Sequence, residues 1–228
     1  MTLREAHEED KAKVITAVCF DIDDTLIDPT KCHAHVMRAV LEDASKRTGQ
    51  KVEEVRRRYE TLRAADCPLT LEYFDLNAKF RAIGSVLRYE ELLENYSHLL
   101  KVYQDVKPTL KGLRGRYGLS AVSNGFFDFQ RTKLESLHLR QYFDAIITAD
   151  MCKAVKPSPT FFRFTSKTLN IQPENILFVD DIEDVAFQAK LWGFRAIWIN
   201  RGGKGNIKKV DFVITDLSEI LHVIQQIS

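Results

Sequence analysis

The stretch Phe20-Asp21-Ile22-Asp23-Asp24-Thr25-Leu26 places the carboxylates of Asp21 and Asp23 directly after the apolar segment 16–20. An apolar run with a polar stop is typical of a parallel strand that is buried on both faces. Open α/β sheets bind their ligands outside the carboxyl ends of such strands. Carboxylates this close together cannot all stay ionised without compensation, usually by a hard cation with oxygen ligands. Asp is also a common turn residue, so the stretch alone is equally compatible with an Asp-rich turn.

Three more polar motifs follow along the chain, each after an apolar run of its own. The run 119–122 leads into Ser123-Asn124-Gly125, the run 145–148 precedes Lys156-Pro157, and the run 176–179 leads into Asp180-Asp181. Because the carboxyl ends of parallel strands converge on one edge of a sheet, the four motifs are expected to meet there. A carboxylate nucleophile, a hydroxyl, an ammonium and a second acidic pair are the groups that phosphoryl transfer requires.

Each motif also has an ordinary structural interpretation. Ser123 is compatible with a turn, Lys156 with a solvated loop, and Asp180-Asp181 with a helix N-cap and an acidic first turn. Their joint occurrence in this order, at four strand ends, favours a functional site.

The four motifs resemble the signature of the haloacid dehalogenase superfamily. Its first motif, DxDx(T/V), is matched by Asp21-Ile22-Asp23-Asp24-Thr25, and its second, a Ser or Thr that closes a core strand, by Ser123. The third, a Lys usually followed by Pro, is matched by Lys156-Pro157, and the fourth by the acidic pair Asp180-Asp181. The resemblance covers nearly the whole chain, from about residue 14 to residue 217.

The resemblance implies a role for each motif residue. Asp21 would attack phosphorus and form an aspartyl-phosphate, and Asp23 would be the general acid and base. Thr25 would orient both carboxylates through its hydroxyl. The groups that would bind the phosphate are the Ser123 hydroxyl, the backbone N–H of Asn124 and the Lys156 ammonium, which would also neutralise the nucleophile.

The resemblance also implies a Mg²⁺ site. Asp21, the backbone carbonyl of Asp23, and Asp181 would bind the ion directly. Asp180 would contact the ion through a water molecule, or would hold the direct ligands in place without touching the ion. Asp184 is the alternative for that place, because Asp180 stands where the family most commonly has Gly. Every ligand atom in this set is an oxygen, which favours Mg²⁺ over zinc.

The order of the remaining segments predicts an α/β fold with a Rossmann-like three-layer core around a parallel sheet. Beyond residue 105, helix-patterned segments alternate with strand-like runs. The expected helices are 109–117, 127–137, 159–169, 183–192 and 217–227, and the further strands are 196–199 and 212–214. We therefore assign residues 1–28 and 106–228 to this core.

Between residues 28 and 105 the alternation stops. Four segments there are helix-patterned, namely 33–47, 52–65, 74–83 and 90–102. A helical insertion after the first strand is what the family calls a cap of the first type, so residues 29–105 are expected to cover the site, exclude water and select the substrate. A helical subdomain with only a packing role is the alternative. Conceivable substrate contacts in this cap segment are Arg63, Tyr73, Phe74, Asn77 and Arg81.

Composition limits the other classes of function. The chain has 228 residues, 45% of them hydrophobic and 29% charged, and a formal net charge of +1, which gives no reason to expect nucleic acid or an anionic membrane as partner. No apolar stretch approaches ~18 residues, and residues 1–13 lack an apolar signal region, so the cytoplasm is the expected compartment. The four cysteines show no CxxC pairing and are expected to be reduced, and none of the six histidines falls in a motif.

These observations predict a Mg²⁺-dependent phosphatase that hydrolyses a small phosphorylated metabolite, a small-molecule phosphate ester, through an aspartyl-phosphate. Dehalogenases of the superfamily lack the second Asp of the first motif, so Asp23 favours an oxygen leaving group. A phosphosugar mutase retains both Asp residues and stays open beside a 2-haloacid dehalogenase. A non-catalytic phospho-switch would be shorter and would lack the helical insertion, and an inactive binding protein would not need the intact motif set. No signal of an oligomeric state is present.

Overall fold

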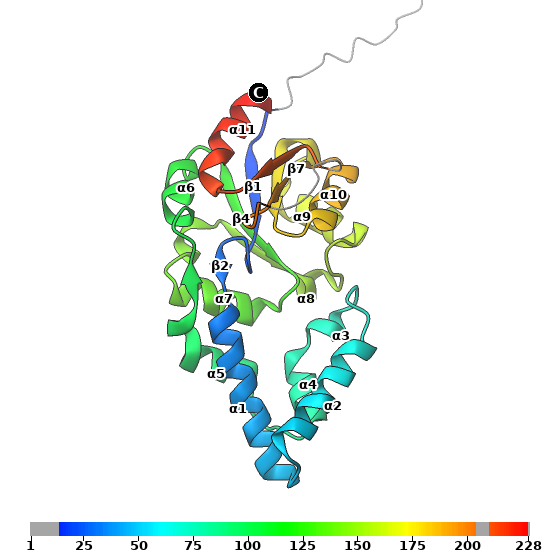
Figure 1. Cartoon of the computed structure of the whole chain (residues 1–228). Helices are drawn as coiled ribbons and strands as arrows, with labels where there is room; N and C mark the ends of the chain where they lie inside the picture. Colours follow the sequence, from blue (N-terminus) through cyan, green and yellow to red (C-terminus); the bar gives the residue numbers. More distant parts are fainter. Residues whose placement is uncertain (1–13, 204–209, 228) are drawn as a thin grey trace, which may run out of the picture.

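A six-stranded parallel sheet occupies the centre of the protein (Figure 1). The computed structural model describes residues 14–203 and 210–227. In spatial order the strands are β5 (Ala145–Thr148), β4 (Gly118–Ser123), β1 (Ala17–Asp21), β6 (Ile176–Asp180), β7 (Arg195–Ile199) and β8 (Phe212–Ile214). All neighbouring strands in this sheet are parallel, which confirms the predicted α/β fold.

Helices cover both faces of the sheet, because the central strands are apolar on both sides. Alternate residues of β1 belong to different cores: Val18 and Phe20 pack on one face, and Ala17 and Cys19 on the other. The first core includes residues of α6 (Val106–Leu113), α7 (Phe127–Ser136), η4 (Leu217–Glu219) and α11 (Ile220–Ile227). The second includes residues of α9 (Pro159–Leu169) and α10 (Glu183–Leu191).

Shorter helical turns connect these elements. They are η2 (Arg140–Tyr142), α8 (Ala149–Cys152) and η3 (Pro173–Asn175). The predicted helix 159–169 is confirmed as α9. Ser158 caps it by accepting the Thr160 N–H at 3.2 Å, and Pro159 stands at its start. The predicted helix 109–117 is wrong at both ends, because α6 begins at Val106 and ends at Leu113.

The chain between β1 and α6 forms a helical lobe at one end of the sheet (Figure 1). Its helices are α1 (Thr30–Thr48), α2 (Val52–Ala65), α3 (Leu71–Phe74), α4 (Leu76–Ala82), α5 (Tyr89–Tyr96) and the 3₁₀ turn η1 (Ser97–Leu99). The single helix expected over 74–83 is interrupted at Asp75. The carboxylate of Asp75 accepts the Ala78 N–H at 2.8 Å and so starts α4 anew.

The helix expected over 90–102 is also wrong in its second half. α5 ends at Tyr96, and β3 (Lys101–Val102) then pairs with β2 (Ile27–Asp28) in a two-stranded antiparallel sheet. This pairing joins the two connections between the helical lobe and the core. Two residues per strand are too few to give a sequence period, so only their tertiary pairing identifies them.

Within the described part of the chain, no helix combines the length and the apolar character needed to cross a membrane. The expected lack of an apolar signal region concerns residues 1–13, which lie outside the described residues.

Candidate active site

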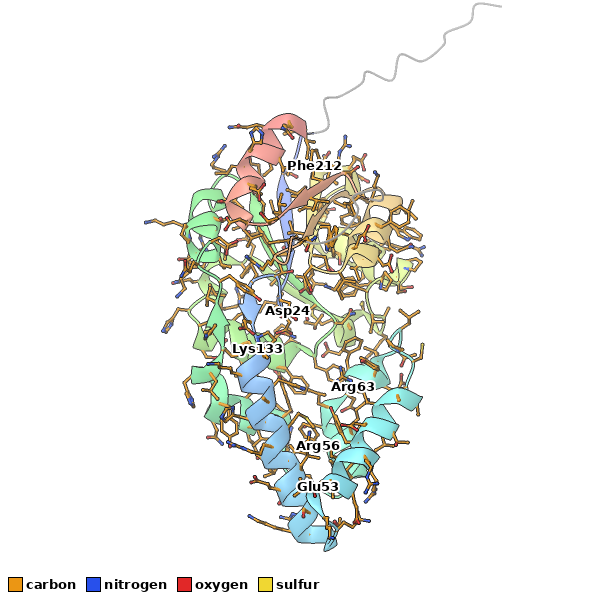
Figure 2. All side chains as sticks on the ribbon, in the orientation of Figure 1. Asp24, Glu53, Arg56, Arg63, Lys133 and Phe212 are labelled. Atoms are coloured by element: carbon orange, nitrogen blue, oxygen red, sulfur yellow. The ribbon has the colours of Figure 1, made fainter. Side chains whose placement is uncertain are left out.

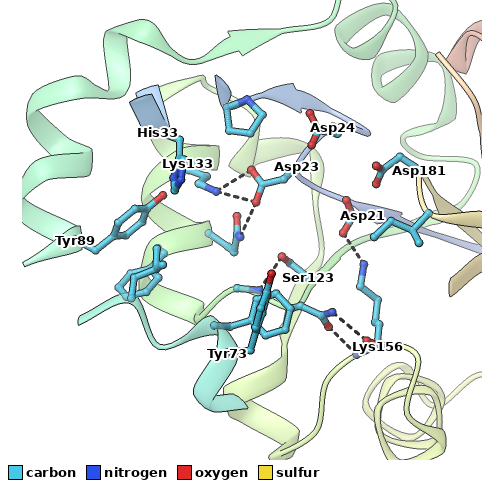
Figure 3. A pocket seen from close by; sticks show the side chains of 18 of the residues that line it. Asp21, Asp23, Asp24, His33, Tyr73, Tyr89, Ser123, Lys133, Lys156 and Asp181 are labelled. Carbon is cyan, nitrogen blue, oxygen red and sulfur yellow. Dashed lines mark hydrogen bonds and ion pairs between the residues drawn. The ribbon is translucent and has the colours of Figure 1, made fainter. Parts of the chain in front are cut away.

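The four motifs meet at the carboxyl edge of the sheet. Asp21 ends β1, and the neighbouring strands β4 and β6 end at Ser123 and Asp180. Lys156 reaches the same place from the loop after α8. A cavity of about 340 Å³ opens there, and its lining includes Asp21, Asp23, Ser123, Asn124, Lys156 and Asp181 (Figure 3). The convergence expected from the strand ends is therefore present.

Lys156 connects two of these carboxylates. Its ammonium, with the residue only 4% exposed, donates to Asp21 Oδ1 at 2.5 Å and to Asp180 Oδ2 at 2.7 Å. Burial disfavours the charged amine, but the carboxylates of Asp180 and Asp21 outweigh it and raise the pKa of Lys156. Lys156 therefore stays protonated and holds the Asp21 carboxylate in place.

Asn124 fixes the loop that carries this lysine. Its amide oxygen accepts the backbone N–H of Lys156 at 2.6 Å, and its amide nitrogen donates to the Lys156 carbonyl at 3.0 Å. The preceding Ser123 hydroxyl accepts the Gly125 N–H at 3.1 Å. Its own O–H remains to donate toward the cavity, as the expected phosphate contact requires.

The acidic residues at this edge repel one another. Burial, with further contributions from Asp180 and Asp181, raises the pKa of Asp21 well above its usual range despite the nearby Lys156 charge. Burial and Asp180 together raise the pKa of Asp181 to about 7. A divalent cation bound between Asp21 and Asp181 would relieve this repulsion, and the donor atoms facing it would be oxygens.

The expected Mg²⁺ ligands fit this arrangement. Asp21, Asp23 and Asp181 all line the cavity (Figure 3). Asp180 binds Lys156 and accepts the Ile182 N–H at 3.0 Å, so its carboxylate lies behind the cavity wall. Across residues 14–203 and 210–227, no three His, Cys, Asp or Glu side chains form a metal site by themselves. The expected set differs from such a site because one ligand is the backbone carbonyl of Asp23.

Two residues that the motifs do not identify bind Asp23. Lys133, on α7, donates to its two carboxylate oxygens at 2.7 and 2.8 Å, and Gln130 donates to Oδ2 at 3.0 Å (Figure 3). Burial opposes the charge, but Lys133 and Gln130 lower the pKa of Asp23. The helix pattern could have identified them. Gln130 and Lys133 are three positions apart and so share one face of α7, and their neighbours in sequence, Phe129 and Leu134, are core residues. Polar residues on such a buried face are candidates for a site.

The backbone turns directly after Asp23. Asp24 adopts a left-handed conformation, with φ of 61°, and its N–H donates to the Ile27 carbonyl at 2.7 Å. Such a turn suits Asp, which tolerates positive φ. The role expected for Thr25 is not found: its hydroxyl is buried and has no hydrogen-bond partner among the described residues. Lys133 and Gln130 orient Asp23 in its place.

The helical lobe closes the other side of the cavity. Of the residues suggested by the sequence, Arg63, Tyr73 and Phe74 line it. Asn77 instead binds the start of α5, where it accepts the Tyr89 N–H at 2.8 Å, and Arg81 is exposed. The sequence reasoning missed further lining residues from this lobe, which are His33, Tyr59, Leu76, Lys79 and Tyr89.

Comparison with known proteins identifies the family of this chain. A family model described as haloacid dehalogenase-like hydrolase matches residues 15–186. The glyceraldehyde 3-phosphate phosphatase of Pyrococcus furiosus is 26% identical, with 93% of this chain and 94% of that protein covered. The solved HAD phosphatase of Thermococcus onnurineus is 34% identical with a TM-score of 0.86, covering 92% of this chain and 98% of that one.

A dehalogenase shares the fold as well. The solved 2-haloacid dehalogenase of Pseudomonas syringae pv. tomato has a TM-score of 0.72 at 23% identity, and 94% of this chain and 100% of that one are covered. At this identity the likeness concerns the fold alone, so the choice between the two reactions depends on the residues of the site.

Proposed function

Because this chain belongs to the haloacid dehalogenase-like hydrolase family, we propose that it is a Mg²⁺-dependent phosphatase that cleaves a small phosphate ester through an aspartyl-phosphate. One observation carries the proposal. Two carboxylates stand two positions apart, and each is bound to its own buried lysine, Asp21 to Lys156 and Asp23 to Lys133. One carboxylate is thereby held for attack and the other for proton transfer.

In the first step, an Asp21 carboxylate oxygen attacks phosphorus, and the bond between phosphorus and the ester oxygen breaks. Asp23, in its protonated form, gives a proton to the leaving oxygen, so an alcohol departs and an aspartyl-phosphate remains. The Ser123 hydroxyl and the Asn124 N–H donate to the phosphoryl oxygens, and Lys156 neutralises their negative charge.

In the second step, water attacks the phosphorus of the aspartyl-phosphate. Asp23 accepts the proton of that water, the bond from phosphorus to Asp21 breaks, and inorganic phosphate leaves. The proton then on Asp23 is the one required for the next leaving group. Mg²⁺ held by Asp21, the Asp23 carbonyl and Asp181 would supply the positive charge that the transferring phosphoryl group needs.

The arrangement around Asp23 favours a phosphatase over a dehalogenase. A halide leaves without a proton, so a dehalogenase has no use for an acid at this place. Here the carboxylate of Asp23 receives three hydrogen bonds from Lys133 and Gln130. We infer that this network orients Asp23 for proton exchange: the ionised form that it favours accepts the proton of the attacking water, and that proton then serves the next oxygen leaving group.

We also propose that residues 29–105 act as the cap. Helices α1 to α5 supply side chains to the same cavity that contains Asp21 and Asp23. A small ester enclosed there would be shielded from water and recognised from the side opposite the phosphate. We expect the protein in the cytoplasm, where phosphorylated metabolites occur.

Phosphate release from p-nitrophenyl phosphate tests the proposal. The purified protein should turn over this ester with Mg²⁺, lose activity in EDTA and regain it when Mg²⁺ is restored. Full activity in metal-free buffer would contradict the metal requirement. A panel of sugar phosphates assayed for both released phosphate and phosphoryl transfer to a second sugar separates a hydrolase from a phosphosugar mutase.

A further inference from the structure

One positive charge on the cap side of the cavity has no carboxylate partner among residues 14–203 and 210–227. The other cations in the cavity lining are paired: Lys156 with Asp21 and Asp180, Lys133 with Asp23, and Lys79 with Asp66. Arg63 of α2 makes no ion pair within the described residues. Figure 2 shows Arg63 on the cap side and Lys133 on the core side.

The guanidinium of Arg63 is nevertheless held in one place. Its Nε donates to the Tyr73 hydroxyl at 3.2 Å, and its Cζ lies 5.5 Å from the centre of the Tyr73 ring. The two terminal amino groups make no hydrogen bond within the described residues. A guanidinium has five N–H donors in a planar fork, so most of its capacity remains for a ligand.

The Tyr59 hydroxyl lies on the same face of α2, one turn before Arg63. The residue is only 6% exposed and lines the cavity, yet its hydroxyl has no hydrogen-bond partner among the described residues. Buried hydroxyls in folded proteins almost always have a partner. An unpartnered hydroxyl next to an unpaired guanidinium therefore indicates a ligand that accepts hydrogen bonds.

His33, on α1, lines the same cavity as Arg63 and Tyr59. Burial is the main cause that lowers the pKa of His33, the charges of Arg63 and Lys133 lower it further, and Asp23 opposes them. The cavity lining also includes four aromatic side chains, Tyr73, Phe74, Tyr89 and Phe129.

We propose that Arg63 and Tyr59 form a second anion site, which binds a carboxylate or phosphate group at the end of the substrate remote from the scissile phosphate. A carboxylate or phosphate oxygen pair matches the guanidinium fork and accepts from the Tyr59 hydroxyl. Arg63 is exposed to water, and a neutral hydroxyl would add no charge pairing to that hydration. The cavity of about 340 Å³ admits a small metabolite that carries both groups.

This inference rests on the proposed phosphatase function and narrows its substrate class. The preferred ester is a phosphorylated acid or a bisphosphate, not a neutral sugar phosphate. The measured quantity is the anion preference, defined as kcat/KM for 6-phosphogluconate divided by kcat/KM for glucose 6-phosphate. A three-carbon pair, 3-phosphoglycerate and glycerol 3-phosphate, covers the shorter span. Fructose 1,6-bisphosphate distinguishes a second phosphate from a carboxylate as the recognised group.

We expect the wild-type preference to be about tenfold or more for at least one pair, since one charge-assisted contact is worth about a tenfold change. Arg63→Met keeps much of the side-chain volume and should lower this preference by about tenfold. Tyr59→Phe should lower it less, without lowering Tm, because the lost hydroxyl makes no hydrogen bond within the described residues.

Arg57→Met is the matched control. Arg57 lies on the same helix but lines a separate hollow with Gln50 and Glu54, away from the catalytic cavity. This variant should keep the wild-type preference. Two results would overturn the second anion site. One is an anion preference near one for both pairs and for the bisphosphate relative to the neutral esters. The other is an equal loss of kcat/KM for anionic and neutral esters in Arg63→Met.

A binding measurement separates this inference from the proposed function. The Asp21→Asn variant is titrated calorimetrically with 6-phosphogluconate and with glucose 6-phosphate, and again with Arg63→Met added. Tighter binding of the acid that disappears with Arg63→Met supports the site even if no ester is hydrolysed. The same titrations are made with 3-phosphoglycerate and glycerol 3-phosphate and with fructose 1,6-bisphosphate. No tighter binding of any of the three anionic esters than of the neutral ones rejects the site even if the protein is an active phosphatase.

Discussion

The ammonium of Lys133 binds both carboxylate oxygens of Asp23, at 2.7 and 2.8 Å, although the two residues are 110 positions apart in the chain. Asp21, only two positions before Asp23, is bound by a different lysine, Lys156. The two carboxylates of the first motif are thus directed to opposite sides of the cavity (Figure 3). In the mechanism that we propose, this separation gives each carboxylate one task, nucleophilic attack for Asp21 and proton transfer for Asp23.

Lys133→Met should lower kcat more than it changes KM. Without the ammonium, Asp23 loses its fixed orientation, so part of the ~10²–10⁴-fold contribution of general acid–base catalysis is lost. We expect a loss of roughly tenfold to hundredfold with an alkyl phosphate, and a smaller loss with p-nitrophenyl phosphate, whose leaving group needs no proton. Steady-state kinetics with both esters measure this difference.

The control for this variant is Arg131→Met. Arg131 lies on the exposed side of the same helix, where it contacts Asp128 at 3.5 Å. It should behave as wild type with both esters. Equal losses of kcat/KM, which reports only the steps up to departure of the leaving group, for the alkyl and aryl esters in Lys133→Met would indicate a general structural defect. The melting temperature of each variant reports such a defect independently.

Asp21→Asn should abolish turnover, because the attacking carboxylate is gone and no phosphoenzyme can form. Its stability should be equal to or higher than that of the wild type. Burial and the neighbouring acidic residues raise the pKa of Asp21, so its charge is disfavoured in the folded state. Acid-quenched labelling with radioactive substrate and thermal denaturation in metal-free buffer measure the two effects. Even a tenth of the wild-type rate in this variant is incompatible with the covalent mechanism.

Asp23→Asn should still bind substrate but turn over slowly. The amide cannot exchange a proton with the leaving oxygen or with water, so kcat for an alkyl phosphate should fall by ~10²–10⁴-fold. The rate of aspartyl-phosphate formation should fall least with p-nitrophenyl phosphate, because its leaving group needs no proton. A burst of p-nitrophenolate followed by slow turnover is therefore expected in stopped-flow experiments. A variant that loses both steps equally would argue against separate acid and base roles for Asp23.

Gly125→Ala should impair the site without removing a side chain that acts in the reaction. A Cβ at this position would collide with the Gln130 side chain, which donates to Asp23 at 3.0 Å. Displacing Gln130 removes one of the groups that orient Asp23, so kcat should fall several-fold, about the effect of one hydrogen bond. Gly112→Ala is the matched control: its Cβ would lie 3.9 Å from Leu221, an ordinary contact, and alanine in a helix should raise Tm slightly.

The local sequence determined the core strands and the identity of the motifs at their ends. Runs such as 176–179, followed by Asp180-Asp181, are short, continuous and apolar, and burial on both faces requires that composition wherever the strand lies in the sheet. The start of α9 was likewise readable from the local sequence. Ser158 accepts a backbone N–H of the first turn and Pro159 has no N–H that needs a partner, so both act within a few positions. Such elements are predictable because the groups that stabilise them are close in the chain.

Tertiary structure alone decided which distant side chains complete the site. Lys133 and Gln130 reach Asp23 only because α7 packs against α5 and β5, in the same core as Phe20 of β1. Tyr59 and Arg63 reach the cavity only because α2 lies beside it. The pairing of β2 with β3 likewise joins residues far apart in sequence. A contact across such a separation depends on the packing of whole elements, and helical or strand periodicity specifies a buried face without naming its partner.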